Sequence, residues 1–322
     1  MNPSTENAAA PKTPPMPKKR NTILLLAAAV LLVTALLVYF KEKETPKGFI
    51  DPSRISSSYY HTVWVKGDGT VDSVGSNQFG ERNLERWSDI VAVDTTAYAT
   101  FGLRKDGTVL AAGAITAVER QLHRMRDLTA IACGDDHLVG LKKDGTVIAI
   151  GSNSEGQTDV KDWTNIVAIM AGQDYTLGLR KDGTVLYTGD LMLEESARNI
   201  AQWKYVKAIS GHCNRAAGLR SDGTAVTSWD TGKYGDWNDI SEWKDLKQIS
   251  VGWNHTIGLK KDGTVIASGS DEYGECEVGD WKNIVLVIAG SEHTIGVTAE
   301  GEVLATGDNR FGQCDVNGRY IR

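Results

Sequence analysis

The sequence predicts an all-β fold, a seven-bladed β-propeller preceded by a single N-terminal transmembrane helix. An Asp-Gly or Glu-Gly pair recurs at intervals of 38 or 40 residues, and a fixed period near forty residues is typical of repeat architectures. The seven pairs begin at Asp68, Asp106, Asp144, Asp182, Asp222, Asp262 and Glu300. Ahead of the repeats, residues 23–40 form an uncharged and almost wholly apolar run.

The N-terminal region divides into a tail, an anchor and a tether. Residues 1–20 are rich in proline and end in Lys18, Lys19 and Arg20, which predicts a disordered cytoplasmic tail. Residues 21–40 are long enough, at about 1.5 Å per residue, to cross a membrane as a helix. Basic residues precede this segment and a balanced Lys-Glu-Lys-Glu sequence follows it, so the N-terminus is expected in the cytoplasm and the repeats outside.

Two further points concern this region. A cleaved signal peptide is the alternative to the anchor, but residues 38–41 offer no small-x-small cleavage site. Residues 41–48 are polar and predict a tether that reaches at most about 30 Å. The propeller domain is expected at residues 49–322.

The fourth repeat shows the strand pattern most clearly. Residues 163–172 contain a short apolar run that ends in small residues, as expected for a strand buried on both faces. The next two stretches flank Asp182-Gly183, and Asp-Gly between β-rich runs indicates a hairpin. Each repeat therefore holds at least three antiparallel strands, with the small-residue strand innermost. Radial repetition of such a sheet gives a propeller.

An aromatic residue opens almost every repeat and fixes the number of blades. The series is Phe49, Trp87, Trp163, Trp203, Trp243 and Trp281, with Met125 in the third repeat. The next such position is Arg319, so residues 49–322 hold seven units. We expect these rings to pack between successive blades, and a sugar-binding ring of tryptophans is the alternative.

The repeats resemble a known family. The pattern Trp-x-x-Ile-Val-x-Ile-x-x-Gly-x-x-His-Thr-x-Gly-Leu-Lys-x-Asp-Gly-Thr-Val, clearest in repeats four, six and seven, resembles the regulator of chromosome condensation repeat. The short period is similar to the bacterial branch of that superfamily, which includes a seven-bladed secreted β-lactamase inhibitory protein. The resemblance implies the propeller fold over residues 49–322, and fold does not by itself imply function.

Neither of two activities in that superfamily is expected here. Nucleotide exchange on a nuclear GTPase does not suit a domain expected outside the cytoplasm. Inhibition of a β-lactamase would need an aromatic-rich face, and the sequence offers only scattered aromatics.

Histidine and cysteine positions point to scaffold rather than to a metal site. Four histidines share one position on the second strand of their repeats: His61, His137, His255 and His293. Repeats six, seven and one are the only contiguous set, and their second strands are expected too far from the axis to share a metal, so we predict structural histidines that bond to neighbouring backbone. The cysteines lack metal-binding spacing and are expected as free thiols, although the equivalent Cys276 and Cys314 could pair outside the cytoplasm. No metal or other cofactor is expected.

The loops that differ most between repeats fall on the face opposite the Asp-Gly hairpins. Loops on a rigid scaffold are the usual place for recognition, and Trp and Tyr are the usual interface anchors. We predict that aromatic and acidic residues of these loops bind a partner: Tyr59, Tyr60, Tyr98, Asp135, Asp136, Asp174, Trp229, Tyr234, Trp237, Trp253 and Tyr273. The alternative is that each loop is merely solvated.

The hairpin face is basic. Ten residues that precede the turns carry positive charge: Lys66, Arg104, Lys105, Lys142, Lys143, Arg180, Lys181, Arg220, Lys260 and Lys261. We predict that this face is turned toward anionic lipid headgroups or wall polymers, although each turn also carries its own acid.

The sequence thus predicts a membrane-anchored, extracytoplasmic interaction module that binds a protein partner and is not an enzyme. A net charge of −6 disfavours a nucleic-acid partner, and we expect a monomer. Two alternatives stay open: cell-wall glycan binding, and a polysaccharide-acting hydrolase or lyase that would use Asp135 or Asp136 with Asp174.

Overall fold

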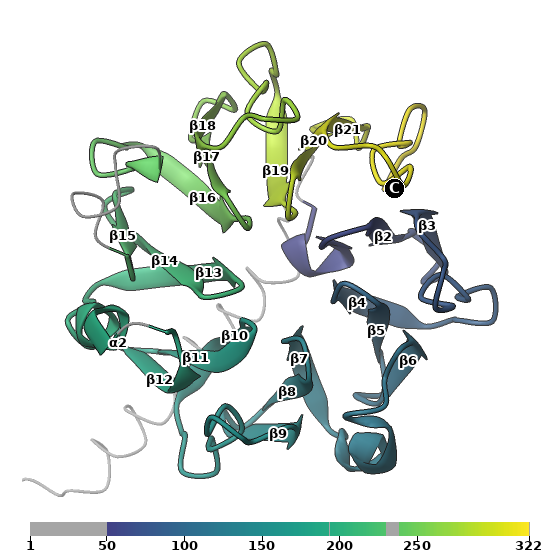
Figure 1. Ribbon diagram of the computed structural model, residues 1–322, viewed down its shortest axis with the longest axis vertical. Coiled ribbons are helices and arrows are strands. Elements are labelled where there is room, and N and C mark those ends of the chain that lie inside the picture. The colour runs from purple at the N-terminus through teal and green to yellow at the C-terminus, as the bar shows by residue number, and fades with distance from the viewer. Residues whose placement is uncertain (1–49, 193, 230–237, 322) are drawn as a thin grey trace, which may run out of the picture. The chain divides into compact units, whose positions relative to one another are not determined.

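Seven three-stranded antiparallel sheets form the blades of a ring in the computed structural model, which describes residues 50–192, 194–229 and 238–321 (Figure 1). The first strands lie nearest the axis: β1 (Ile55–Ser57), β4 (Ile90–Thr95), β7 (Leu128–Cys133), β10 (Ile166–Ala171), β13 (Val206–His212), β16 (Leu246–Val251) and β19 (Ile284–Ala289). The second strands are β2 (His61–Val65), β5 (Ala99–Arg104), β8 (His137–Lys142), β11 (Asp174–Arg180), β14 (Arg215–Arg220), β17 (His255–Lys260) and β20 (His293–Thr298). The third strands are β3 (Val71–Gly75), β6 (Val109–Gly113), β9 (Val147–Gly151), β12 (Val185–Asp190), β15 (Ala225–Thr227), β18 (Val265–Gly269) and β21 (Val303–Gly307). The prediction of an all-β chain with seven blades of three strands is confirmed.

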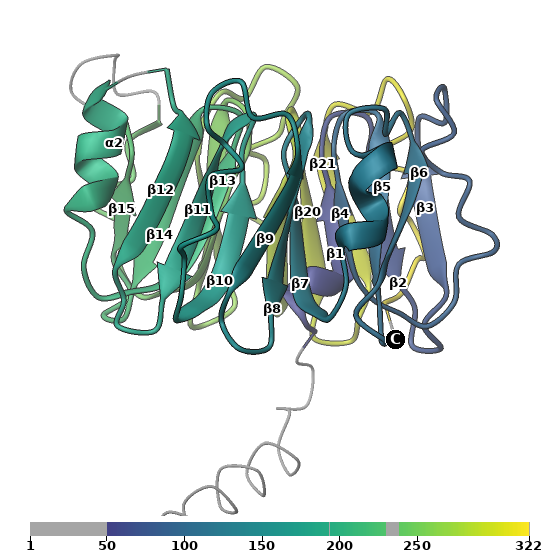
Figure 2. The same cartoon turned by 90° about the horizontal axis from the view of Figure 1, so that it is seen from below.

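The antiparallel order gives the ring two unlike faces, seen edge-on in Figure 2. The upper face carries the loops between first and second strands and the start of the linker that follows each third strand. The lower face carries the Asp-Gly hairpins between second and third strands. Blades are numbered 1 to 7 in chain order, so that blade 1 holds β1–β3 and blade 7 holds β19–β21.

The lower hairpins are built by the side chain of their own aspartate. The Asp68 carboxylate accepts hydrogen bonds from the backbone N (2.9 Å) and the hydroxyl (2.6 Å) of Thr70. These bonds lower the pKa of Asp68. Gly69 has φ +81°, a conformation that glycine adopts without strain. The same contacts recur at Asp106, Asp144, Asp182, Asp222 and Asp262. The repeated turn is therefore scaffold.

The tryptophans that open the repeats pack between blades, as predicted. Trp87 lies so close to Gly102 that a Cβ at position 102 would be 2.5 Å from the indole ring. Its cluster joins Val63 of blade 1 to Ile90 of blade 2. The same ring-on-glycine contact recurs at Trp163–Gly178, Trp203–Gly218, Trp243–Gly258 and Trp281–Gly296. Within the described residues, each of the seven hydrophobic clusters fills the space between two neighbouring blades.

The equivalent histidines tie neighbouring blades through a hydroxyl relay. His61 Nε2 lies 2.9 Å from Thr100 Oγ1 of the next blade, and that hydroxyl donates to Glu81 O (2.8 Å). His137 pairs in the same way with Thr176, and His255 with Thr294. The sequence predicted bonds to neighbouring backbone, whereas the threonine hydroxyl stands between the histidine and the carbonyl.

The buried histidines predict a specific loss of stability in acid. Burial lowers the pKa of His61, His137, His212 and His293 to about 4, and that of His255 to about 3. An unfolded histidine titrates near 6.5, so between pH 6.5 and 4 the unfolded chain binds protons that the folded chain does not. The free energy of unfolding should therefore fall as the pH falls through that window.

Urea unfolding at pH 7.5, 6.0 and 5.0 measures this effect. A variant with His137→Gln and His255→Gln should be less stable at pH 7.5 but should lose less stability on acidification, whereas His123→Gln, at an exposed position, should behave as the native chain. The turn aspartates have lowered pKa values and titrate below this pH window, so they do not account for a change in stability within it. An equal pH dependence of stability in the native and double-variant chains would contradict the claim that the buried histidines cause the loss of stability in acid.

Blades 1 and 7 meet without exchanging a strand, because each of their sheets is one continuous segment of chain. The seam between them is filled by Ile55 and Trp64 of blade 1, Ile295 of blade 7, and Val316 and Ile321 of the C-terminal segment. Side-chain packing therefore closes the ring.

Polar contacts reinforce this seam. Thr62 Oγ1 donates to Gln313 O (3.0 Å), and the Arg319 guanidinium lies 3.2 Å from the Asp72 carboxylate. Ser291 N also donates to Ser58 O (3.1 Å), which links the upper loops of blades 7 and 1. The segment after β21 therefore packs into the seam that follows blade 7, as the interblade linkers pack into the seams that follow the other blades.

Several predicted elements lie outside the described residues: the tail (1–20), the transmembrane segment (21–40), the tether (41–48) and Phe49. None of the helices in the described ranges combines the length and apolar character that a membrane crossing requires. Within the residues that the structure describes, three short helices were not predicted: η1 (Pro52–Arg54) before blade 1, η2 (Glu119–Arg124) after blade 2 and α2 (Glu194–Ala201) after blade 4.

Candidate interaction face

Four linkers begin on the upper face with the same six-residue turn, at 76–81, 152–157, 270–275 and 308–313. Each turn ends in a buried Glu or Gln whose side chain accepts from the backbone N of the residue two positions earlier. These bonds are Phe79 N to Glu81 (2.7 Å), Glu155 N to Gln157 (3.0 Å), Tyr273 N to Glu275 (2.8 Å) and Phe311 N to Gln313 (3.0 Å). The turn is thereby fixed, and the side chain of the bonded residue is held at the surface.

Six aromatic side chains of the upper face form a continuous surface, called here the aromatic arc: Trp253, Tyr59, Tyr60, Phe311, Tyr98 and Phe79. Tyr59 lies 5.8 Å from Trp253 and 5.7 Å from Tyr60 between ring centroids. Tyr60 lies 4.9 Å from Phe311 and 5.9 Å from Tyr98, which is 4.9 Å from Phe79. The arc spans blades 6, 7, 1 and 2. The expectation that the aromatics are scattered was wrong, because loops of different blades bring them together.

Most of the arc is open to solvent. Trp253, Tyr98, Phe311 and Phe79 are 42 to 50% exposed, whereas Tyr59 and Tyr60 are half-buried beneath them. Large apolar side chains that touch one another at the surface mark interaction sites more often than isolated ones do.

Tyr59 anchors the arc across the ring axis. Its hydroxyl lies 2.9 Å from Cys213 Sγ in blade 5, and its ring lies 5.2 Å from that of His212. His212 in turn contacts Ser291 of blade 7 (3.3 Å). Burial raises the pKa values of the Tyr59 hydroxyl and the Cys213 thiol, so both groups stay neutral. All four cysteines are free, and these contacts make Cys213 part of the scaffold beneath the arc.

A central cavity of about 340 Å³ lies along the axis and is lined by residues of all seven first strands. Ser56 donates to Asp94 (2.9 Å), which also accepts from Cys133 N (2.9 Å). Ser250 holds in β16 the position that Asp94 holds in β4, and its hydroxyl likewise accepts a hydrogen bond from the next first strand, from Ala289 N (2.9 Å). The polar residues of the cavity therefore bridge adjacent first strands.

Three predicted acids come together beside the arc. Asp135 and Asp136 lie in the loop between β7 and β8, and Asp174 begins β11 of the next blade. Burial and then the charges of Asp174 and Asp136 raise the pKa of Asp135. Burial, followed by Glu155 and Asp136, raises the pKa of Asp174. Among the described residues these three carboxylates make no ion pair.

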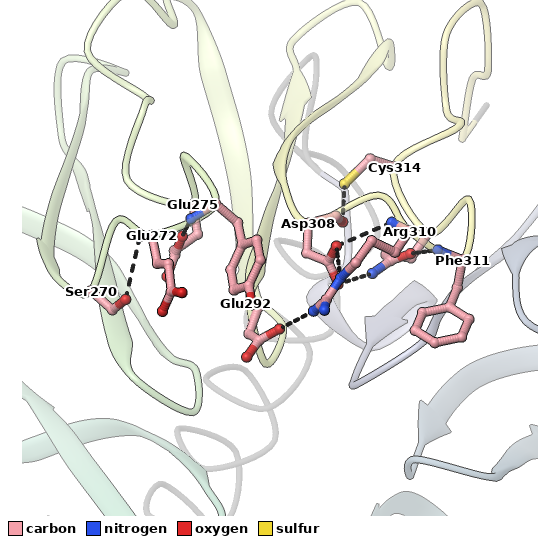
Figure 3. Close-up of polar contacts among 10 residues, drawn as sticks. Ser270, Glu272, Glu275, Glu292, Asp308, Arg310, Phe311 and Cys314 are labelled. Atoms are coloured by element: carbon pink, nitrogen blue, oxygen red, sulfur yellow. Dashed lines mark hydrogen bonds and ion pairs between the residues drawn. The ribbon is translucent and has the colours of Figure 1, made fainter.

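Tyr273 lies under the guanidinium of Arg310, and Figure 3 shows Arg310 bonded to Glu292 and Asp308. The Arg310 guanidinium lies 4.6 Å from the Tyr273 ring centroid and 2.9 Å from the Glu292 carboxylate. It also bonds to Asp308 (2.8 Å), and these contacts raise the pKa of Arg310. This group is a complete cation site made from the chain's own side chains.

Trp229 does not join the arc. It lies under the Arg215 guanidinium (4.2 Å) and packs against the hydrophobic cluster between blades 5 and 6. Tyr234 and Trp237 lie outside the described residues. Phe79 and Phe311 were not among the predicted binding residues, although both, like Tyr273, stand two residues before the buried Glu or Gln of their turns. That shared spacing is the sequence signal that identifies Phe311.

The fold and its loop-bearing face define a β-propeller of repeated three-stranded blades. Three of its repeats, at residues 128–157, 246–275 and 284–313, match the model of the regulator of chromosome condensation (RCC1) repeat. Each match begins with a first strand and ends at the buried Gln or Glu of the upper turn. Among curated proteins, none matches this chain.

Solved structures from plants and yeast share the fold. The CRINKLY WD40 ectodomain of the Arabidopsis thaliana receptor kinase ACR4 has a TM-score of 0.66 and 19% identity, covering 79% of this chain and 94% of that one. The ectodomain of the Physcomitrella patens receptor kinase CR4 has a TM-score of 0.62 and 16% identity, covering 79% and 73%. Prp20p of Saccharomyces cerevisiae has a TM-score of 0.56 and 15% identity, covering 75% and 81%. These identities establish the likeness in fold alone.

Proposed function

We propose that this chain is a membrane-anchored, extracytoplasmic interaction module that binds a protein partner through the aromatic arc. The observation that carries the proposal is the continuity of the arc, in which loops from four blades bring six aromatic rings into contact. Trp and Tyr dominate the binding energy of protein interfaces, and the arc contributes three tyrosines and one tryptophan.

The surroundings of the arc support recognition of a protein. Two of its exposed rings, Phe79 and Phe311, stand on turns fixed by buried Glu and Gln side chains, so little conformational entropy of these turns is lost when a partner binds. Prp20p, which shares the fold, has binding properties toward Gsp1p and histones. The arc spans neighbouring blades on one face, which suits an extended protein surface better than a single sugar ring.

Crosslinking of the full chain in its own membranes tests the proposal. The proteins captured by the native chain are compared with those captured by a variant in which Tyr98, Trp253 and Phe311 are alanine. Loss of a captured protein supports the proposal. Retention of a glycan by both chains, with no protein lost from the variant, would favour glycan binding instead.

The proposed location rests on the apolar segment at 21–40 and on the charges around it. A propeller of this fold forms the ectodomain of the receptor kinase ACR4, so the fold suits a place outside the cytoplasm. The basic residues beside the lower hairpins would face anionic headgroups, and the turn carboxylates, whose bonds to threonine keep them ionised, would offset part of that attraction.

Protease protection measures this topology. In sealed right-side-out vesicles, protease added outside should remove a tag placed after residue 322 and leave a tag placed before residue 1. The chain should stay with the vesicles after an alkaline wash, as an integral membrane protein does. The opposite pattern of tags, or release by the wash, would refute the anchored orientation.

A further inference from the structure

The upper face carries a strong excess of negative charge around the arc. The loops between first and second strands and the four six-residue turns contain nine acidic residues and one cation among the described residues. The acids are Glu81, Asp135, Asp136, Glu155, Asp271, Glu272, Glu275, Glu292 and Asp308, of which Glu81, Glu275 and Asp308 are buried. The cation is Arg310, and Arg215 at the start of β14 adds a second beside these loops. A partner that covers this face must therefore supply positive charge or leave several carboxylates desolvated without a counter-charge.

One cation on this face belongs to the chain itself and shows how the surface receives a guanidinium. Arg310 lies over the Tyr273 ring (4.6 Å), while Glu292 and Asp308 accept hydrogen bonds from it. An aromatic ring below and carboxylates at the side give both cation–π attraction and charge-assisted hydrogen bonds. Arg310 already satisfies this site, so it is not the surface that remains open.

The arc offers the same two kinds of group, and two cations lie at its edge: Arg215 donates to the Trp253 carbonyl (3.2 Å), and Arg310 precedes Phe311 in its turn. Among the described residues, Arg310 lies over Tyr273 and Arg215 lies over Trp229, and no guanidinium or ammonium group lies over the exposed rings of Trp253, Tyr98 and Phe311. Tyr59, at the inner edge of the arc, is close enough to Asp135 for that carboxylate to contribute to its electrostatic environment. The arc therefore lies near Asp135, whose charge and those of Asp136 and Asp174 repel one another.

We propose that the segment bound by the aromatic arc is basic, with arginine or lysine side chains that lie over its exposed rings and pair with Asp135, Asp136 and Asp174. This inference rests on the proposed function and adds the chemical class of the partner. The apolar rings provide most of the contact area, and the carboxylates select the sign of charge. An acidic segment is rejected by like-charge repulsion, which is the usual means of excluding wrong partners.

Peptide binding to the full chain in detergent micelles tests the inference. The probes are three fluorescent peptides of equal length: an Arg-Gly repeat, a Glu-Gly repeat and a Ser-Gly repeat, each with one central Trp. The Arg-Gly peptide should bind, and its affinity should fall as salt is raised from 50 to 500 mM. The triple variant Asp135→Asn, Asp136→Asn, Asp174→Asn should bind it about tenfold more weakly, since partly exposed ion pairs contribute up to about 1 kcal/mol each.

A matched control removes three negative charges elsewhere. Glu85→Gln, Asp162→Asn and Glu242→Gln lie at exposed positions that precede the packing tryptophans, and this variant should bind within about twofold of the native chain. The triple variant of Asp135, Asp136 and Asp174 is called here the acid variant. The inference is overturned if the acid variant binds the Arg-Gly peptide as tightly as the control variant does. It is also overturned if the native chain binds the Ser-Gly or Glu-Gly peptide as tightly as the Arg-Gly peptide.

The two proposals fail in different ways. If crosslinking shows that the aromatic variant keeps its partners, the proposed function is wrong. If the aromatic variant loses a partner that the acid variant keeps, the arc binds that partner without selecting positive charge, and only the present inference is wrong. Loss of the same partner in both variants, together with binding of the Arg-Gly peptide, supports both.

Discussion

A variant in which Tyr98, Trp253 and Phe311 are alanine is expected to lose at least about a hundredfold in affinity for its protein partner while it keeps its fold. Interface anchors of this kind contribute about 2 kcal/mol each when truncated, and about 2.7 kcal/mol in total already gives a hundredfold. All three side chains are more than 40% exposed, so their removal leaves no cavity in the core. Tyr59 is left intact because it ties blade 1 to blade 5 through Cys213.

The measurement combines quantitative crosslinking with titration of the captured partner, and thermal unfolding checks the fold. A matched control replaces three exposed apolar residues that are not in the arc: Val167, Tyr205 and Tyr320. Tyr205 precedes β13 and is 74% exposed, more than any ring of the arc. Equal loss of partner in both variants would mean that exposed apolar area in general, rather than the arc, drives binding.

Replacement of Trp64 by alanine is expected to cost about 3–5 kcal/mol of the free energy of unfolding. Trp64 is 1% exposed and packs at the seam between blades 1 and 7. No strand is shared across that seam, so the ring has no hydrogen-bonded sheet there to offset the loss. Denaturant unfolding gives the size of the effect, and hydrogen exchange shows where the structure opens.

The informative comparison is Trp87→Ala, which removes a buried indole from the seam between blades 1 and 2. Both variants should be strongly destabilised. Only the Trp64 variant should show faster exchange in β2 and β20 than in β8 and β17, because the Trp87 seam is also held by a continuous linker. A loss below about 1 kcal/mol for Trp64→Ala would refute the view that this packing closes the ring.

Much of the scaffold could be predicted because it repeats. Asp68-Gly69 determines a hairpin locally, through bonds to a threonine two residues away, and the same local chemistry recurs in other repeats. Trp87 could be assigned to interblade packing because its position stays in phase with the other tryptophans. The helices α2 and η2 could not be predicted in this way, since they stand where the linkers depart from the repeat.

The arrangement of the upper face was less predictable because it depends on contacts between distant segments. Tyr59 and Cys213 are separated by 154 residues, and only the radius and closure of the ring bring them to 2.9 Å. The contact of Tyr60 with Phe311 likewise requires blade 7 to return beside blade 1. The residues Tyr59, Tyr60, Tyr98 and Trp253 were selected from sequence, but their union into one surface, and the role of Phe311, required the structure.

The continuous blades have a consequence for how such a chain can evolve. Every sheet is encoded by one uninterrupted stretch, and the seam is made by the same kind of side-chain packing that joins other blades. A gene duplication or deletion that spans one whole unit would leave all other sheets with their hydrogen-bonded partners. In a ring closed by a shared strand, the same event would have to preserve both halves of a split sheet. The number of blades is therefore open to change by single recombination events, and recognition loops can be exchanged together with the blade that carries them.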